Sequence, residues 1–162
     1  RISAVGLGDV SVSSKGASID VVATLPRIEG AEDSIPRLLI QRGVLSVRND
    51  SNWVFREIEV LSASLEQDES GMPYTKLVLS DDVRKTLEEE VRADPSGFLY
   101  FFLDDKQIVK RPNNNLIRSD ELRLRSVVGG KRDQMKTTVD WSIALEHGPI
   151  PCTMTLKEVF SM

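Results

Sequence analysis

The sequence predicts an α+β fold in which helices cover one face of a largely antiparallel sheet. Residues 18–25 alternate apolar and polar side chains, which is typical of a half-buried strand. The apolar residues Val83, Leu87 and Val91 recur every four positions, which indicates an amphipathic helix. Residues 98–103 form the most apolar run of the chain. An acidic turn follows them, as expected of a buried strand that opens a hairpin.

The first third of the chain is predicted to form a strand, a helix and a second strand. Pro26 ends the first strand, because proline has no N–H to donate to a sheet. Asp33 or Ser34 can cap a helix that ends near Gly43, a residue type common just after helix C-termini. The apolar residues of 44–48 then predict a strand.

The middle of the chain is predicted to be rich in strands. Residues 53–66 contain Trp, Val, Phe and Ile, which favour one or two strands, and residues 74–79 predict another. Ser80 is a suitable cap for the helix that carries the four-residue apolar repeat. The Pro-Ser-Gly sequence at residues 95–97 ends that helix.

The last third begins with the return strand of the hairpin, at residues 107–109. Residues 121–128 alternate again and predict a strand, which Gly129-Gly130 breaks. A helix is predicted over residues 132–147, and residues 150–156 predict a closing strand.

The predicted elements follow the order β-α-β-β and then β-α-β-β-β-α-β. Repeated split β-α-β units with antiparallel hairpins predict a ferredoxin-like α+β sandwich. No linker-like segment interrupts the pattern, so we expect a single ferredoxin-like domain over residues 1–162. A chain of this size buries about 70% of its unfolded surface, so it can fold without disulfides or metals.

Composition excludes several classes of protein. One Cys and one His cannot form an internal disulfide or a closed zinc site. With 40% hydrophobic and 28% charged residues, the chain is typical of globular rather than disordered proteins. No apolar run is long enough to span a bilayer. Because the sequence begins at Arg1 rather than Met, we expect a fragment or a processed chain.

Charge is distributed unevenly, although the formal net charge is −4. Residues 57–105 carry 13 acidic and 4 basic side chains, a net −9, whereas residues 106–136 carry 9 basic and 3 acidic ones, a net +6. The simplest interpretation is two solvated surfaces that complement each other; the alternative is a basic face for lipid headgroups or nucleic acid. A pI of about 5.1 and a basic segment without Phe, Tyr or Trp argue against nucleic acid.

The residue patterns do not support catalysis or cofactor binding. Gly6-Leu7-Gly8 lacks the third glycine of a dinucleotide-binding loop. Cys152 has no second Cys to assist it and is expected to be a small buried hydrophobe. His147 lies in the last turn of a predicted helix, where a partly charged imidazole interacts favourably with the helix dipole. We therefore predict no catalytic, cofactor-binding or metal-ligating residues, and no enzyme activity.

Three polar motifs have simple structural explanations. Asp104-Asp105 suits a tight turn and offers too few oxygens for a calcium site. Glu88-Glu89-Glu90 is expected to be a solvated helix face. Asn49-Asp50-Ser51 matches the N-glycosylation acceptor pattern and lies on a predicted polar turn, which would suit an exported surface.

Two segments carry longer motifs. Residues 101–112 read Phe-Phe-Leu-Asp-Asp-Lys-Gln-Ile-Val-Lys-Arg-Pro, and residues 145–152 read Leu-Glu-His-Gly-Pro-Ile-Pro-Cys. They are similar to Ile-Val-Leu-Asp-Gly-x-x-Ile-x-x-x-Pro and Leu-Arg-x-Gly-x-Leu-Pro-Val of the first extracytoplasmic domain in the SecD family of protein-export membrane proteins. The resemblance covers nearly the whole chain, because weaker matches occur in the same order at residues 1–6, 21–26, 45–48 and 71–73.

Some residues depart from the family pattern. Asp105 stands where the family has a turn glycine, and Arg111 and Pro149 stand where it has small residues. The short interval that follows Arg48 leaves no room for the large inserted head of bacterial long forms. The resemblance therefore implies the short form without a head, as in archaeal relatives.

The resemblance implies a non-enzymatic, ferredoxin-like domain on the extracytoplasmic side of the cell membrane, held by flanking transmembrane helices. It implies a role in Sec-dependent protein translocation driven by the ion gradient, with no cofactor. The implied partners are SecF, the Sec channel and the emerging unfolded polypeptide, and not nucleic acid. The ion-carrying carboxylates of the family lie in its membrane helices, so none maps onto this chain.

The sequence leaves two main hypotheses of function. In the first, an exposed sheet edge or an apolar groove of the export domain binds an extended segment by strand addition. In the second, a free-standing ferredoxin-like module binds a small molecule for regulation, which predicts a gene product that ends near Met162. Nucleic-acid binding by residues 106–136 is a third possibility and predicts an affinity that depends steeply on salt.

Overall fold

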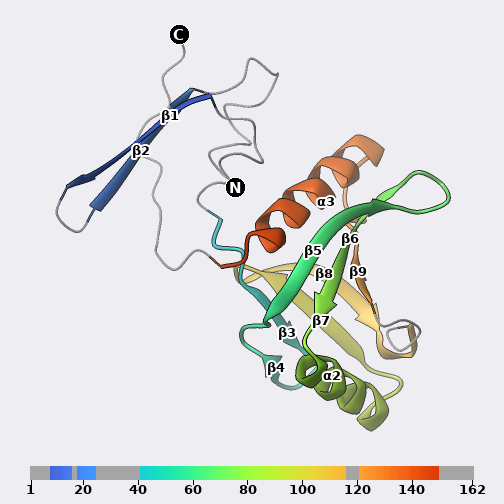
Figure 1. Cartoon of the computed structure of the whole chain (residues 1–162). Coiled ribbons are helices and arrows are strands. Elements are labelled where there is room, and N and C mark those ends of the chain that lie inside the picture. Colours follow the sequence, from blue (N-terminus) through green and yellow to red (C-terminus); the bar gives the residue numbers. More distant parts are fainter. Residues whose placement is uncertain (1–7, 16–17, 25–40, 116–120, 150–162) are drawn as a thin grey trace. The chain divides into compact units, whose positions relative to one another are not determined.

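The computed structural model describes residues 8–15, 18–24, 41–115 and 121–149 (Figure 1). These residues belong to two compact units, one with a two-stranded hairpin and the other within Arg42–Pro151. All strand pairs in both units are antiparallel, which confirms the predicted α+β class.

Three sequence-based expectations are not tested by the described residues. The helix expected before Gly43 and the closing strand expected at residues 150–156 lie outside them. A single continuous domain over residues 1–162 stays a prediction.

The smaller unit contains the hairpin of β1 (Gly8–Lys15) and β2 (Ser18–Thr24). β2 confirms the strand predicted from alternation. β1 was not predicted, because its sequence is rich in serine and its apolar alternation is short. Its pairing with β2, in which Val12 lies opposite Val21, defines it as a strand.

The larger unit contains a four-stranded sheet made of β3 (Leu45–Arg48), β4 (Trp53–Phe55), β7 (Phe98–Leu103) and β8 (Lys106–Pro112). The strand order is β4-β3-β7-β8, so β7 pairs with β3 on one side and with β8 on the other. This arrangement confirms the predicted hairpin after residue 103, and β8 extends beyond the return strand expected there.

The second sheet of this unit has the order β5-β6-β9 and consists of β5 (Val60–Gln67), β6 (Pro73–Leu79) and β9 (Leu122–Leu124). The segment predicted as one or two strands at residues 53–66 is therefore two strands, β4 and β5, in different sheets. Between them, the buried Ile58 donates its N–H to Leu45 O at 2.7 Å. That contact holds the crossing segment against β3.

β9 is shorter than the strand predicted at residues 121–128. After Leu124 the backbone turns towards the last helix, where the Ser126 N–H donates to Thr138 Oγ1 at 3.2 Å. The Val128 N–H then donates to Ser126 Oγ at 3.5 Å. Side-chain acceptors thus replace the sheet partners that alternation alone would predict.

Both predicted helices of the larger unit are present: α2 (Asp81–Ala93) and α3 (Lys131–Glu146). Ser80 caps α2, as predicted, by accepting from the Val83 N–H. α3 packs against β5 and β6 (Figure 1). At that contact, Thr75 Oγ1 lies 2.7 Å from Ser142 Oγ, so the buried hydroxyls satisfy each other.

The core of the larger unit depends on alternation along β7. Leu99, Phe101 and Leu103 are at most 2% exposed, whereas the residues between them are half-buried. The other large apolar side chains that are fully buried come from β3, β6, β9 and both helices: Leu45, Val47, Leu77, Val91, Leu124 and Leu145. One face of β7 therefore supplies the centre of the apolar core.

We expect Leu99→Ala to lower the free energy of unfolding by about 3–5 kcal/mol, because it removes buried methyl groups and leaves a cavity. Urea denaturation measures this change. Leu61→Ala is the matched control, because Leu61 is 58% exposed, and its effect should stay below about 1 kcal/mol. Equal effects of the two substitutions would contradict the assignment of Leu99 to the core.

Candidate functional site

The described residues contain no group of three or more His, Cys, Asp or Glu side chains that could hold a metal ion. Within the same ranges, no helix is long and apolar enough to cross a membrane. A candidate binding site in these ranges therefore has to be identified from the contacts and exposure of individual side chains.

The residues considered for catalysis are placed as follows. His147 is the exposed C-cap of α3, and the next residue, Gly148, has a φ of +66°, which is common directly after a helix. This agrees with the predicted position at a helix end. Cys152 and the first two residues of Gly6-Leu7-Gly8 lie outside the described residues, and Gly8 begins β1.

Asp104 and Asp105 form the tight turn between β7 and β8, as predicted. Both have positive φ, 50° and 66°. The Asp104 carboxylate accepts from the N–H groups of Gly43 (3.1 Å) and Val44 (2.8 Å). Asp104 thus fastens the turn to the chain that enters β3, which is a structural role.

The Asn49-Asp50-Ser51 motif forms a turn that is tied to α2 and β7. Asn49 Oδ1 accepts from two backbone N–H groups of the turn, and Asn49 Nδ2 donates to Glu90 Oε2 at 2.9 Å. Asp50 accepts from the Tyr100 hydroxyl at 2.7 Å and from the Phe98 N–H at 3.3 Å. The amide nitrogen that a glycan would modify is therefore engaged in a tertiary hydrogen bond.

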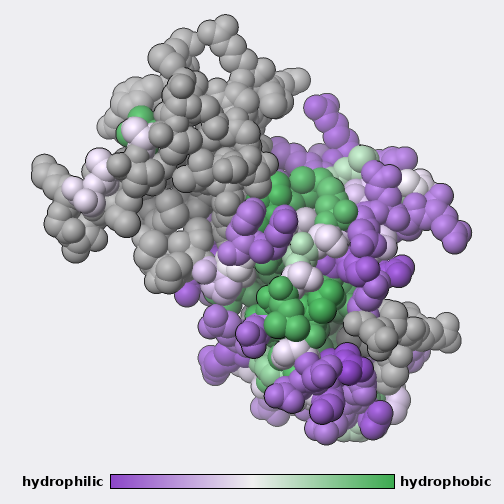
Figure 2. Space-filling model, in the orientation of Figure 1, coloured by the Kyte–Doolittle hydropathy of each residue, from purple (hydrophilic) through white to green (hydrophobic). Residues whose placement is uncertain are grey.

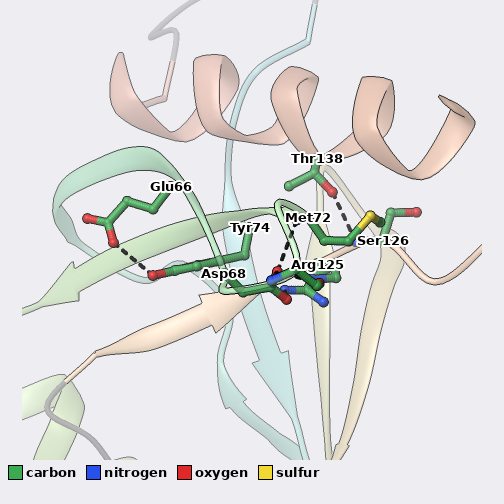
Figure 3. A network of polar contacts seen from close by, with 8 residues as sticks. Glu66, Asp68, Met72, Tyr74, Arg125, Ser126 and Thr138 are labelled. Carbon is green, nitrogen blue, oxygen red and sulfur yellow. Dashed lines mark hydrogen bonds and ion pairs between the residues drawn. The ribbon is translucent and has the colours of Figure 1, made fainter. Parts of the chain in front are cut away.

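A polar network holds the loop between β5 and β6 (Figure 3). Asp68 accepts from Ser70 Oγ (2.6 Å), from the Met72 N–H (2.9 Å) and from Arg125 Nη2 (2.5 Å). The Ser70 hydroxyl, the Met72 N–H and the Arg125 guanidinium hold the pKa of the Asp68 carboxyl well below its usual range. The loop is thereby fixed to the chain that leaves β9.

A second set of polar contacts lies on the face of the same sheet. The Tyr74 hydroxyl donates to Glu66 Oε2 at 2.8 Å, and Lys76 Nζ lies 2.6 Å from Glu121 Oε1 and 3.3 Å from Glu66 Oε1. Hydrogen bonds to Glu121 and Glu66 raise the pKa of Lys76. Because each charge has an opposite partner, these residues connect strands and offer no free acid or base.

The outer edge of β5 is the feature most suited to binding. In the described part of the chain, β5 pairs only with β6. Leu65 lies opposite Thr75, on the face that α3 covers, and is 45% exposed; Leu61 is 58% exposed. Figure 2 shows hydrophobic side chains gathered where β5 crosses the view, with hydrophilic ones around them.

Sequence reasoning placed a strand here but did not single out Leu61 and Leu65. Their alternation with Ser62 and Ser64 is visible in the sequence. Whether the leucines face the core or a sheet edge depends on the strand order, which the alternation does not reveal.

Neither a protein-family model nor a curated relative matches the chain. Several solved structures, however, are similar to the chain. The chain is similar to SecDF in a super-membrane-facing form, with a TM-score of 0.71 and 15% identity over 97% of this chain and 26% of that one. It is also similar to a structure of SecDF described as a membrane component that enhances protein export, with a TM-score of 0.64 and 16% identity over 99% of this chain and 88% of that one.

A third similar structure is SecDF from Thermus, described as a translocon-associated membrane protein, with a TM-score of 0.50 and 16% identity over 92% of this chain and 26% of that one. The chain thus spans 26% of the first and of the third of these SecDF chains and 88% of the second. The resemblance to SecD seen in the sequence motifs is confirmed at the level of the fold.

We expect Asp105→Gly to stabilise the protein by up to about 1 kcal/mol. Asp105 has a φ of 66°, and glycine adopts positive φ without the steric cost of a Cβ. Two-residue hairpin turns of this kind favour Asp-Gly. Thermal unfolding measures the effect. Asp105→Ala keeps the strain and is the control; stabilisation by Ala as well would rule out this explanation.

We expect Asp68→Asn to lower the unfolding midpoint at pH 7, because asparagine cannot form the charge-assisted bond to Arg125. The native pKa of Asp68 is lowered, so its contribution is complete above the unfolded pKa of about 4. It is lost as the pH falls further, towards the native pKa. The difference between the two proteins should therefore shrink in acid.

Urea denaturation between pH 7 and pH 2.5 tests this dependence. Glu69→Gln is the control, because Glu69 is exposed and adjacent in sequence, so the substitution changes the net charge equally. A difference between Asp68→Asn and the parent protein that is constant over this pH range would show that the carboxylate charge contributes nothing.

Proposed function

We propose that this chain is an extracytoplasmic domain of a SecD-like protein-export membrane protein and that it assists Sec-dependent translocation without catalysing a reaction. The observation that carries the proposal is the likeness in fold to SecDF over 97% of the chain. The collinear motifs at residues 101–112 and 145–152 support it independently. Because a fold by itself does not establish a function, the proposed mechanism is argued from the exposed edge of β5.

The domain acts by holding an extended segment of the exported chain at the edge of β5. Backbone hydrogen bonds at a strand edge do not depend on the side chains of the added segment, which suits a partner of variable sequence. Leu61 and Leu65 offer apolar contact to alternate side chains of that segment. Retention on the outer side of the membrane would bias the movement of the chain outward.

The other components of the proposed function lie outside this chain. SecF and the Sec channel would be the partners, flanking transmembrane helices would anchor the domain, and the ion gradient would act through carboxylates in those helices. The alternative, a free-standing ferredoxin-like module that binds a small molecule, gains no support from the three solved structures described above, which are all SecDF.

Photo-crosslinking tests the proposed contact. In the full-length membrane protein, Leu61 or Leu65 is replaced by p-benzoylphenylalanine, and an exported chain is arrested in transit. We expect a crosslink between the β5 edge and the arrested chain. The same replacement at Glu89, on the exposed side of α2, is the matched control and should give little crosslinking.

Two results would contradict the proposal. Crosslinking of equal strength at Glu89 would show that the arrested chain lies near the domain in general and does not bind specifically at the β5 edge. Export at the normal rate by the membrane protein from which only residues 1–162 have been deleted would show that the domain is dispensable.

A further inference from the structure

Aromatic side chains line one face of the four-stranded sheet, opposite its core. Phe98, Tyr100 and Phe102 alternate along β7 with the fully buried residues, so they share the other face. The Phe98 and Tyr100 ring centroids are 6.5 Å apart. The Phe102 ring lies 5.2 Å from that of Trp53, which is on β4 and 39% exposed. Three of the rings therefore lie along β7, and the ring of Trp53 lies beside that of Phe102.

Exposed cations lie over these rings. Lys110 Nζ is 3.9 Å from the Phe98 centroid and 5.3 Å from the Tyr100 centroid. Arg48 Cζ lies 6.0 Å from the Tyr100 centroid, and Arg56 Cζ lies 6.0 Å from the Trp53 centroid. We call the surface made by these residues the aromatic–cationic face: Arg48, Trp53, Arg56, Phe98, Tyr100, Phe102 and Lys110.

The cations of this face have one carboxylate beside them, that of Asp50, whose charge interacts with Lys110 and Arg48. Arg48, Arg56 and Lys110 form no ion pair with any residue that the structure describes, whereas Lys76, Arg123 and Arg125 on the other sheet all do. Asp50 borders the face, where the Tyr100 hydroxyl, the Phe98 N–H and the charges of Lys110 and Arg48 lower the pKa of its carboxyl. One carboxylate beside three cations leaves the face with a net positive charge, although the whole chain carries −4.

We propose that the aromatic–cationic face is a docking surface for an acidic, extended segment of a partner polypeptide. Carboxylates of the segment bind Lys110, Arg48 and Arg56, and its apolar side chains lie against Phe102 and Trp53. The rings restrict the cations in advance, so less conformational freedom is lost when a carboxylate binds. The inference does not rest on the export role, because the face belongs to a different sheet from the β5 edge.

A nucleic acid fits this face less well than an acidic polypeptide. Single-stranded bases need free ring faces for stacking, and Lys110 already lies over Phe98 and Tyr100. The contact between Lys110 and the rings shows, however, that the basic segment 106–136 does have aromatic neighbours, which its own sequence lacks.

Fluorescence anisotropy with the 162-residue chain tests the proposal. The probe is a labelled ten-residue peptide of alternating Glu and Val, and the same peptide with Gln in place of Glu is the control ligand. We expect the Glu peptide to bind at least about tenfold more tightly than the Gln peptide. Binding should also change the tryptophan fluorescence of the chain. The change is assigned to Trp53, because the other tryptophan, Trp141, is buried and only 8% exposed.

The double variant Arg48→Gln/Lys110→Gln should weaken binding of the Glu peptide by about tenfold. The variant Lys131→Gln/Arg132→Gln removes the same charge from an exposed end of α3 and should weaken it by no more than about twofold. If the double variant at the face unfolds, the affinities of the single variants Arg48→Gln and Lys110→Gln are measured in its place. Equal losses at both sites, equal binding of the two peptides, or tighter binding of a ten-nucleotide oligothymidine would each overturn the proposal.

Discussion

The structure of the larger unit depends on the alternation of side chains along β7. One face of this strand supplies Leu99, Phe101 and Leu103 to the core, and the other supplies three of the four rings of the aromatic–cationic face. Both sets are fixed by the same backbone pairing with β3 and β8. A shift of register by one residue would exchange them and would place the half-exposed rings in the core. Stability and the proposed docking surface are therefore consequences of one constraint.

Three aspartates maintain the geometry around that strand and the neighbouring sheet. Asp104 fastens the turn after β7 to the entry of β3, Asp50 fastens the turn after β3 to β7, and Asp68 fastens the β5–β6 loop to Arg125. In each case the carboxylate accepts backbone or side-chain hydrogen bonds that the turn itself cannot provide. Acidic groups that would draw attention as catalytic or metal-binding candidates are thus used to close loops.

The likeness to SecDF concerns the fold of the chain, whereas the surface features concern what the chain could bind. The fold is shared with SecDF at 15–16% identity, which establishes architecture but transfers no residue role. The β5 edge and the aromatic–cationic face are argued from the residues of this chain. They lie on separate sheets, and each suits a different kind of extended segment, apolar at the first and acidic at the second.

The sequence by itself determined the elements whose signals are local. Alternation predicted β2, the apolar run at residues 98–103 predicted β7, Ser80 predicted the start of α2, and the two aspartates at residues 104–105 predicted the hairpin turn. Local patterning also explains why β9 was predicted too long, because nothing in residues 125–128 shows that Ser126 bonds to Thr138.

Only the tertiary structure decided which residues meet across long intervals of sequence. It paired β3 with β7, separated β4 from β5, connected Asn49 to Glu90 and placed Lys110 over Phe98. The motifs that resemble SecD anticipated the fold, but they did not show a binding surface. The physical reason is that propensity and periodicity act over a few residues, whereas strand order and register depend on the packing of the whole chain.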